Sequence, residues 1–246
     1  MRVENRLDEI RGRIALAAGK SDRRPENITL VAVTKTLPVE VVLSGYQAGI
    51  RHFGENRAEE LARKSAEVDK LEAANRIIWH QIGSLQSRKS NLVADHADVF
   101  HALDRSKIAR RLSNRLTENG RAINRPLPVF LEVNVSGEKS KAGIDCTDWQ
   151  NDSSKREQLL SLAQEIENLS GLTPRGLMTM APWKVEEKIV RDVFQQTRQL
   201  SEWLQSAAPE SDWSKLSMGM TDDFEIAIEE GATHVRIGRA IFGERR

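Results

Sequence analysis

Cysteine and tyrosine are almost absent from this sequence, which has one of each, Cys146 and Tyr46. A single cysteine excludes an intrachain disulfide framework and any metal site built from several cysteines. Neither sign of charge is in excess, because 37 Lys and Arg stand against 36 Asp and Glu. Nucleic-acid-binding proteins usually carry a basic excess, so the composition argues against that class.

Long apolar runs are also missing. None reaches the roughly 20 residues that a membrane-spanning helix needs. The first ten residues are largely charged or polar and lack the apolar core of a signal peptide. We therefore expect a cytoplasmic protein without membrane contact. No obvious apolar patch indicates self-association, so we expect a monomer.

What the sequence does contain is a regular alternation of strand-like and helix-like segments. An amphipathic helix is predicted over residues 2–18, within an N-terminal segment 1–19. Eight strand-like runs follow: 28–35, 52–56, 77–83, 99–104, 127–135, 175–180, 215–220 and 234–239. Helical patterns lie between most of them: 39–48, 57–74, 87–95, 105–118, 152–169, 184–206 and 222–230. This order predicts a parallel sheet with helices outside.

Two parallel architectures fit such a pattern, an open doubly wound sheet and a closed barrel. Eight units in 246 residues favour the barrel, which typically needs ~250 residues. No G-x-G-x-x-G motif follows the first strand-like run, which disfavours a dinucleotide-binding sheet. We therefore predict one α/β domain over residues 1–246, a single (β/α)8 TIM barrel with an extra N-terminal helix. The polar stretch 137–155 is predicted as a long loop over the barrel mouth.

Lys35 is the residue with the clearest chemical meaning, because it ends the first strand-like run. A cation at the end of a buried strand is costly unless it is paired or used. A lysine placed there can lose its proton and attack a carbonyl group. Lowering its pKa from near 10.4 to 7 would take ~4.6 kcal/mol of selective destabilisation of the ammonium. The alternative is a lysine whose ammonium reaches solvent.

The ends of the last two strand-like runs indicate an anion site. Barrels often bind phosphate in the loops after strands seven and eight, with help from the start of a short helix. Ser217 and Thr221 supply hydroxyl groups, Gly219 and Gly238 allow close backbone approach, and residues 240–243 can start a short helix. Either glycine alone could merely satisfy a turn. The two together favour a phosphate site.

A reactive lysine and a phosphate site at one barrel mouth indicate a phosphorylated aldehyde, and pyridoxal 5′-phosphate fits both parts. Arg236 alternates with Val235 and Ile237, so it points to the opposite face of its strand. It could pair with the phosphate or approach the pyridine nitrogen of this cofactor. The alternative is a surface arginine.

Other conspicuous residues are interpreted as structural. His80 is expected to pack inside the barrel, and the other histidines lack metal-ligand spacing, so no metal is expected. The charge-rich stretch 55–70 is interpreted as a solvated helix face with i,i+4 ion pairs. Cys146 lies in a polar stretch and is assigned no function.

Seven segments together resemble the YggS/PROSC family of pyridoxal phosphate homeostasis proteins, and the resemblance covers nearly the whole chain. They are, in order, VAVTKT at 31–36, HFGEN at 52–56, WHQIGSLQS at 79–87 followed by Lys89, SKAGI at 140–144, RGLMTM at 175–180, LSMGMTDD at 216–223 and VRIGRAIFG at 235–243. One departure is a longer polar insertion after Gly143, to about Lys155, which bears on how the mouth is covered.

The resemblance implies a barrel of the fold-type III class, similar to the N-terminal domain of alanine racemase. It implies that pyridoxal 5′-phosphate is held as an aldimine on Lys35, with Asn56 beside it. The implied phosphate contacts are Ser217, Gly219, Arg236 and Gly238. Lys141, in the SKAGI motif, would be a second, transient contact for the cofactor, and a solvated loop lysine is the alternative.

The implied function is intracellular homeostasis of pyridoxal phosphate, with apo forms of cofactor-dependent enzymes as recipients and without robust catalysis. The alternative is an amino-acid racemase of fold type III. Such an enzyme needs a second base on the opposite face of the substrate, commonly a tyrosine from another domain or subunit. Here the only tyrosine, Tyr46, lies inside a predicted helix, away from the barrel mouth. This favours the carrier, and no residue is assigned a catalytic role.

Overall fold

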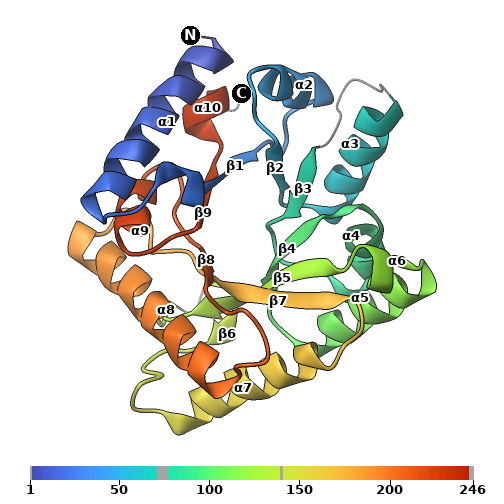
Figure 1. Ribbon diagram of the computed structural model, residues 1–246, viewed down its shortest axis with the longest axis vertical. Helices are drawn as coiled ribbons and strands as arrows, with labels where there is room; N and C mark the ends of the chain where they lie inside the picture. The colour runs from blue at the N-terminus through green and yellow to red at the C-terminus, as the bar shows by residue number, and fades with distance from the viewer. Residues whose placement is uncertain (1, 71–76, 139–140, 244–246) are drawn as a thin grey trace.

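The computed structural model describes residues 2–70, 77–138 and 141–243 of the chain. Its strands are all parallel and form one sheet in the order β4-β3-β2-β1-β9-β8-β7-β5-β6, and a further pairing of β4 with β5 closes the barrel (Figure 1). The predicted (β/α)8 barrel is therefore confirmed. The strands are β1 Thr29–Val33, β2 His52–Glu55, β3 Ile78–Gln81, β4 Val99–Leu103, β5 Leu127–Asn134, β6 Ile144–Asp145, β7 Leu172–Met178, β8 Lys215–Ser217 and β9 His234–Ile237.

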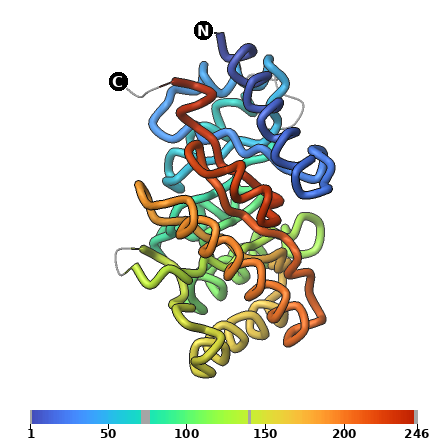
Figure 2. Tube along the Cα trace, turned by 90° about the vertical axis from the view of Figure 1, so that its left-hand side faces the viewer, coloured from blue at the N-terminus to red at the C-terminus, as the bar shows by residue number. Residues whose placement is uncertain are grey.

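Helices surround the barrel (Figures 1 and 2). They are α1 Val3–Lys20, α2 Val39–Gln47, α3 Ala58–Lys70, α4 Ser90–His96, α5 Ser106–Glu118, α6 Arg121–Asn124, α7 Ser153–Glu167, α8 Glu187–Ala207, α9 Phe224–Glu229 and α10 Arg239–Phe242, with 3-10 turns η1 Pro25–Asn27 and η2 Ser87–Lys89. The short helix expected near residues 240–243 is present as α10. The predicted helix 57–74 is confirmed as far as Lys70, and its last residues lie outside the described part.

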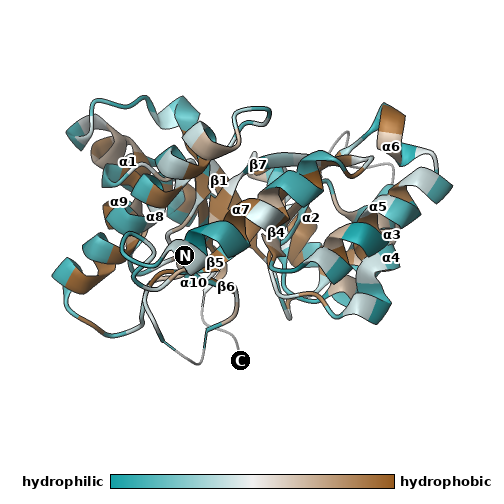
Figure 3. Cartoon of the chain, turned by 90° about the horizontal axis from the view of Figure 1, so that it is seen from below, coloured by the Kyte–Doolittle hydropathy of each residue, from teal (hydrophilic) through white to brown (hydrophobic). Residues whose placement is uncertain are grey.

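Helical periodicity explains how these helices cover the barrel. In α5, Ile108, Leu112 and Leu116 recur every four residues and are fully buried, so they form one apolar face. The strands are buried on both faces, as Val31 and Ala32 show in β1. In Figure 3 the strands are mostly apolar, and the helices around them carry both apolar and hydrophilic stretches.

The strand β7 begins at Leu172, three residues before the predicted start at Arg175. Pro174 lies inside it, and a proline looks like an interruption because it cannot donate a ladder hydrogen bond. The register between β5 and β7 shifts at this point, where Val129 pairs with Pro174 and Phe130 with Gly176. The skipped residue is a bulge, which accommodates the proline.

The stretch 137–155 differs from the prediction of a plain polar loop. Ile144 and Asp145 form β6, which pairs with the end of β5. Cys146 and Trp149 are buried and join the core. Apolar residues spaced among polar ones gave no strand or helix periodicity, so the sequence did not reveal this local core.

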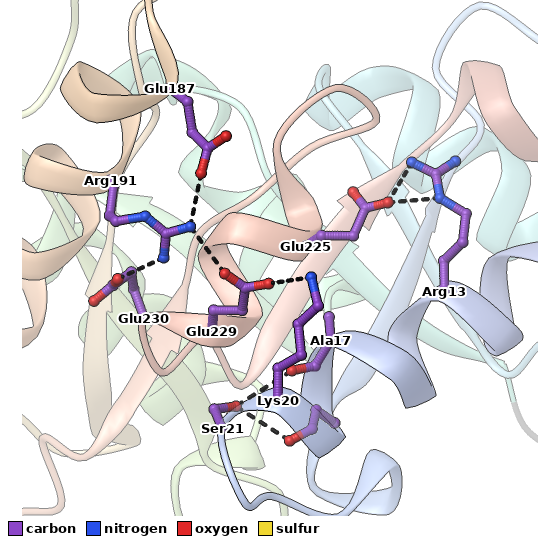
Figure 4. Close-up of polar contacts among 10 residues, drawn as sticks. Arg13, Ala17, Lys20, Ser21, Glu187, Arg191, Glu225, Glu229 and Glu230 are labelled. Carbon is purple, nitrogen blue, oxygen red and sulfur yellow. Dashed lines mark hydrogen bonds and ion pairs between the residues drawn. The ribbon is translucent and has the colours of Figure 1, made fainter.

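The N-terminal helix runs to Lys20, slightly beyond the expected segment 1–19, and packs beside α9 and α10. Ion pairs fasten it (Figure 4). Arg13 of α1 binds Glu225 of α9 at 2.6 Å, and Lys20 binds Glu229 at 3.0 Å. Arg191 of α8 reaches the same end of α9, where it binds Glu229 and Glu230 and also pairs with Glu187. The extra helix is thus an integral part of the helical ring.

Within the described ranges, no helix combines the length and the apolar character needed to cross a bilayer.

Candidate functional site

A cavity of about 390 Å³ lies at the carboxyl ends of the barrel strands. This is the end of the barrel where parallel α/β folds place their sites. Its polar lining comes from different strands and their following loops: Lys35, Asn56, Ser84, Glu132, Thr221, Asp222, Arg236 and Arg239. Met180, Trp183 and Met220 add apolar surface, and the Trp183 side chain is largely exposed. The cavity therefore lies at the end of the barrel where the sequence analysis predicted the site.

Lys35 lies just after the end of β1 and lines this cavity. It is half-buried, which places its stem in the wall of the cavity. The next residue, Thr36, has a φ of 65°, a conformation that strains a β-branched residue. Strained backbone is often found at functional sites. The structure thus brings Lys35 to the predicted place on a sharply turned segment.

Asn56 follows β2 and lines the cavity beside the β3 end. The side-chain amide of Gln81 donates to the carbonyl oxygens of Asn56 and Gly83, at 2.9 and 3.0 Å. A side chain on Gly83 would overlap the Asn56 carbonyl group. The turn after β3 therefore requires glycine, and Gln81 fixes Asn56 in the wall.

Arg236 of β9 is a buried residue of the cavity wall, which excludes the alternative of a surface arginine. Its Nη1 donates to the carbonyl oxygen and to Oγ of Ser217, both at 2.7 Å, and its Nη2 donates to the Thr179 carbonyl oxygen at 2.9 Å. Burial lowers the pKa of Arg236 to about 10, so it remains a cation at neutral pH. The wall of the cavity therefore contains a buried guanidinium cation that is held in place by hydrogen bonds.

The residues predicted to hold a phosphate fall into two layers. Gly238 lines the cavity, and so does Thr221, the second hydroxyl residue of the phosphate hypothesis. Ser217 is fully buried beneath the cavity lining. Gly219 also lies outside the lining, and its φ of 93° together with the close Ala227 Cβ explains the glycine. Direct contact of Ser217 or Gly219 with a cofactor stays a prediction.

Below Ser217, a row of histidines crosses the barrel interior. His52 Nδ1 lies 2.9 Å from His80 Nε2, His80 Nδ1 lies 2.8 Å from His101 Nε2, and His101 Nδ1 lies 2.8 Å from Ser217 Oγ. Burial lowers the pKa of each of these histidines, so each is neutral at neutral pH and has one ring N–H. The Ser217 hydroxyl already accepts from Arg236 and can donate to His101. His80 is therefore packed in the barrel, as predicted.

Glu132 of β5 is a site residue that the sequence analysis did not single out. Its side chain is 2% exposed, its Oε2 has no hydrogen-bond partner among the described residues, and it lines the cavity. Burial raises its pKa to about 7, and nearby Asp104 acts in the same direction while Arg236 opposes it. The available signal was a glutamate inside the apolar run of residues 127–135.

Lys141 differs from a solvated loop lysine. Its Nζ donates to the Met180 carbonyl oxygen at 2.8 Å and pairs with Glu138 at 3.2 Å, and its side chain is 14% exposed. It does not line the cavity, but Met180 does. The preceding motif residue, Ser140, lies outside the described residues. Contact between Lys141 and a cofactor stays a prediction.

The interpretation of residues 55–70 as a solvated face is wrong for two of its charges. Glu55 is in β2 and Lys64 is in α3, and both side chains are fully buried and paired at 2.7 Å. Arg63 and Glu67 do form the expected exposed i,i+4 pair. Lys64 falls on the barrel-facing side of α3, where the sequence pattern alone predicted only apolar residues.

The lining has the groups that a phosphorylated aldehyde requires. It offers a primary amine from Lys35, a buried cation from Arg236 and, in Glu132, a buried oxygen that lacks a partner in the described protein. Gly238 lines the cavity and is the residue before α10, and the start of a helix is where proteins often bind anions. In the described part of the chain no group of three or more His, Cys, Asp or Glu is placed to hold a metal ion.

Comparison with known proteins gives a consistent result. The family model described as Alanine racemase, N-terminal domain, matches residues 6–246. The "Pyridoxal phosphate homeostasis protein" of Vibrio alginolyticus is 40% identical over 243 residues, covering 99% of this chain and 97% of that one. PipY of Synechococcus elongatus PCC7942, solved with PLP bound, is 31% identical with a TM-score of 0.81, covering 98% and 100% of the two chains. The match to an alanine racemase of Clostridium difficile 630 has a TM-score of 0.68 at 13% identity and covers 89% of this chain and 56% of that one, so it shows the fold alone.

Proposed function

We propose that this protein binds pyridoxal 5′-phosphate and takes part in its intracellular homeostasis. The chain belongs to the alanine racemase N-terminal domain family and, within it, to the pyridoxal phosphate homeostasis proteins. The observation that carries this proposal is that Lys35 and the buried Arg236 line the same cavity. A relative solved with this cofactor bound supports it.

In this proposal each group of the cavity has a separate task. The cofactor supplies an aldehyde carbon that a primary amine can bond reversibly. Lys35, which lines the cavity, would supply that amine in its neutral form. Gly238 and Thr221 would hold the phosphate, with Ser217 and Gly219 supporting them. Arg236 either pairs with the phosphate or approaches the pyridine nitrogen.

Mass spectrometry after borohydride reduction tests the assignment of Lys35. The purified protein is incubated with pyridoxal phosphate and reduced, and the modified peptide is mapped. We expect the main label on Lys35 and its loss in Lys35→Ala. Lys141→Ala should keep the Lys35 label and lose only a minor, transient one. Labelling of Lys35→Ala at wild-type level would show that another amine holds the cofactor.

We further propose that the protein delivers the cofactor to apo-enzymes and does not turn over amino acids. The relatives are named for homeostasis. Tyr46 packs under the Arg51 guanidinium near the amino-terminal end of β2, and it is not among the cavity-lining residues of the described chain. Exchange of amino-acid Cα protons in deuterated water decides between carrier and racemase. Exchange that Lys35→Ala abolishes would establish an enzyme.

The monomeric state and the cytoplasmic location are parts of the same proposal. Sedimentation equilibrium should give the mass of one chain, 27.7 kDa. Fractionation of cells that express the protein should place it in the cytoplasm.

A further inference from the structure

A cluster of buried charges lies behind the segment that carries Lys35. Lys64 of α3 is fully buried, and its Nζ donates to Glu55 Oε1 at 2.7 Å, Glu60 Oε1 at 2.8 Å and the Thr34 carbonyl oxygen at 2.8 Å. An ammonium has three N–H donors, and Lys64 uses all of them. We call Lys64, Glu55, Glu60 and Thr34 the Lys64 cluster. The Thr34 hydroxyl donates to the same Glu55 oxygen at 2.6 Å. The cluster is thus almost fully hydrogen-bonded, as a buried charge requires.

The bonds of the Lys64 cluster end on the two residues that flank Lys35. Thr34, immediately before it, is held through both its carbonyl oxygen and its hydroxyl group. Thr36, immediately after it, donates its backbone N–H to Glu60 Oε1 at 2.7 Å. Thr36 is also the residue with a φ of 65°. A hydrogen bond to a carboxylate at that N–H stabilises a turn that threonine would otherwise avoid.

The cluster also places charge next to Lys35. Lys64 stands against two carboxylates, Glu55 and Glu60, so its positive charge offsets negative charge that would favour the ammonium form of a neighbouring lysine. Burial raises the pKa of Glu55, and the hydrogen bonds from Lys64 and Thr34 oppose this. The other charged residues that line the same cavity as Lys35 come from other elements: Glu132, Asp222, Arg236 and Arg239.

We propose that the Lys64 cluster is the positioning device of Lys35, which fixes the direction of its side chain and balances the charge on which its free-amine fraction depends. Lys64, Glu55 and Glu60 are positioning residues, since they act through Thr34 and Thr36. This inference rests on the proposed function, because it takes Lys35 as the lysine that bonds the cofactor.

The test measures the rate at which pyridoxal phosphate becomes bound to the protein, by absorbance from pH 6 to 10. The limiting rate at high pH reports the position of Lys35, because its amine is then unprotonated. The midpoint of the rise of the rate with pH reports the charge around Lys35, because nearby charges change the pH at which its ammonium loses a proton. In Glu60→Gln we expect the limiting rate to fall about tenfold, since a charged acceptor is replaced by a neutral one. Its midpoint should move to lower pH, because a negative charge is lost.

Lys64→Met should shift the midpoint in the opposite direction, to higher pH, and should also lower the limiting rate. This variant leaves Glu55 buried without its cation, so its fold is checked by circular dichroism. The double variant Lys64→Met with Glu55→Gln removes both charges and should also bind slowly. If neither folds, Glu60→Gln carries the test, because the Glu60 side chain is 15% exposed.

Glu67→Gln is the matched control, since Glu67 lies on the same helix and its ion pair with Arg63 is exposed. It should leave both quantities unchanged. The inference would be overturned if Glu60→Gln and Lys64→Met had the same pH midpoints and limiting rates as Glu67→Gln. Failure of the proposed function is a separate result, because Lys35→Ala would then still take up the cofactor at the wild-type rate.

Discussion

The buried carboxyl group of Glu132 makes the stability of this protein depend on pH in a defined direction. Burial raises its pKa from 4.5 to about 7. Between these two values the folded state holds a proton that the unfolded state has lost, so the contribution of Glu132 to stability is complete below pH 4.5 and is lost as pH rises through 7. At about 1.4 kcal/mol per pH unit, the full loss amounts to about 3.5 kcal/mol.

The perturbation is Glu132→Gln, which keeps the shape of the side chain and removes the titration. Urea unfolding of the cofactor-free proteins from pH 5 to 8.5 gives the free energy of unfolding at each pH. Relative to the wild type, the variant should gain stability as pH rises, by about 2.5 kcal/mol over this interval, with the change complete near pH 8. The change with pH in the difference between the two free energies of unfolding is the diagnostic quantity. A difference that is constant with pH reports only how the glutamine amide packs.

Glu157→Gln is the control, because Glu157 is an exposed residue of α7. Its curve should run parallel to that of the wild type. If the Glu132→Gln curve is also parallel to the wild-type curve, the Glu132 carboxyl group is not held protonated by burial, and the reasoning from its buried position fails.

Three further predictions concern the fold. Gly176→Ala should prevent normal folding, seen as loss of the cooperative thermal transition, because a Cβ at Gly176 would overlap the Lys215 carbonyl group in the neighbouring strand; a wild-type melting temperature would contradict this. Arg191→Met should cost about 1 kcal/mol at low salt and less at 1 M salt, since its ion pairs with α9 are partly exposed; a loss independent of salt would show that packing of the side chain, not charge, is responsible. Cys146 is buried and its pKa is raised to about 12, so a thiol reagent should modify it only after unfolding, and rapid modification of the native protein would refute the buried position.

The fold class could be predicted because the signals that set it are local. The alternation of apolar strands with amphipathic helices is visible in any window of the chain. It placed Lys35 at the end of its strand and the glycines of the last two loops correctly. The sequence patterns did not predict the structure where the local pattern conflicts with the tertiary arrangement. Pro174 concealed the start of β7, and the scattered apolar residues around Cys146 concealed a piece of the core.

The candidate site could be predicted in part. Lys35, Asn56, Arg236 and Gly238 were chosen from strand ends and motifs, and the structure brings them to one cavity. Glu132 was missed because a glutamate within an apolar run does not show which face of the strand it occupies. Ser217 was expected at the phosphate, and the structure places its hydroxyl group against Arg236 and His101.

The sequence by itself determined that this chain forms a barrel and which lysine stands at its mouth, because strand and helix periodicity and the position of a residue in its segment are properties of a continuous stretch. Only the tertiary structure decided which charges meet. The side chains of Lys64 and Glu55 are 0% exposed and bonded to each other, although in the sequence they belong to what looked like a solvated helix face. Burial and pairing depend on which segments are packed together, and no local window contains that information.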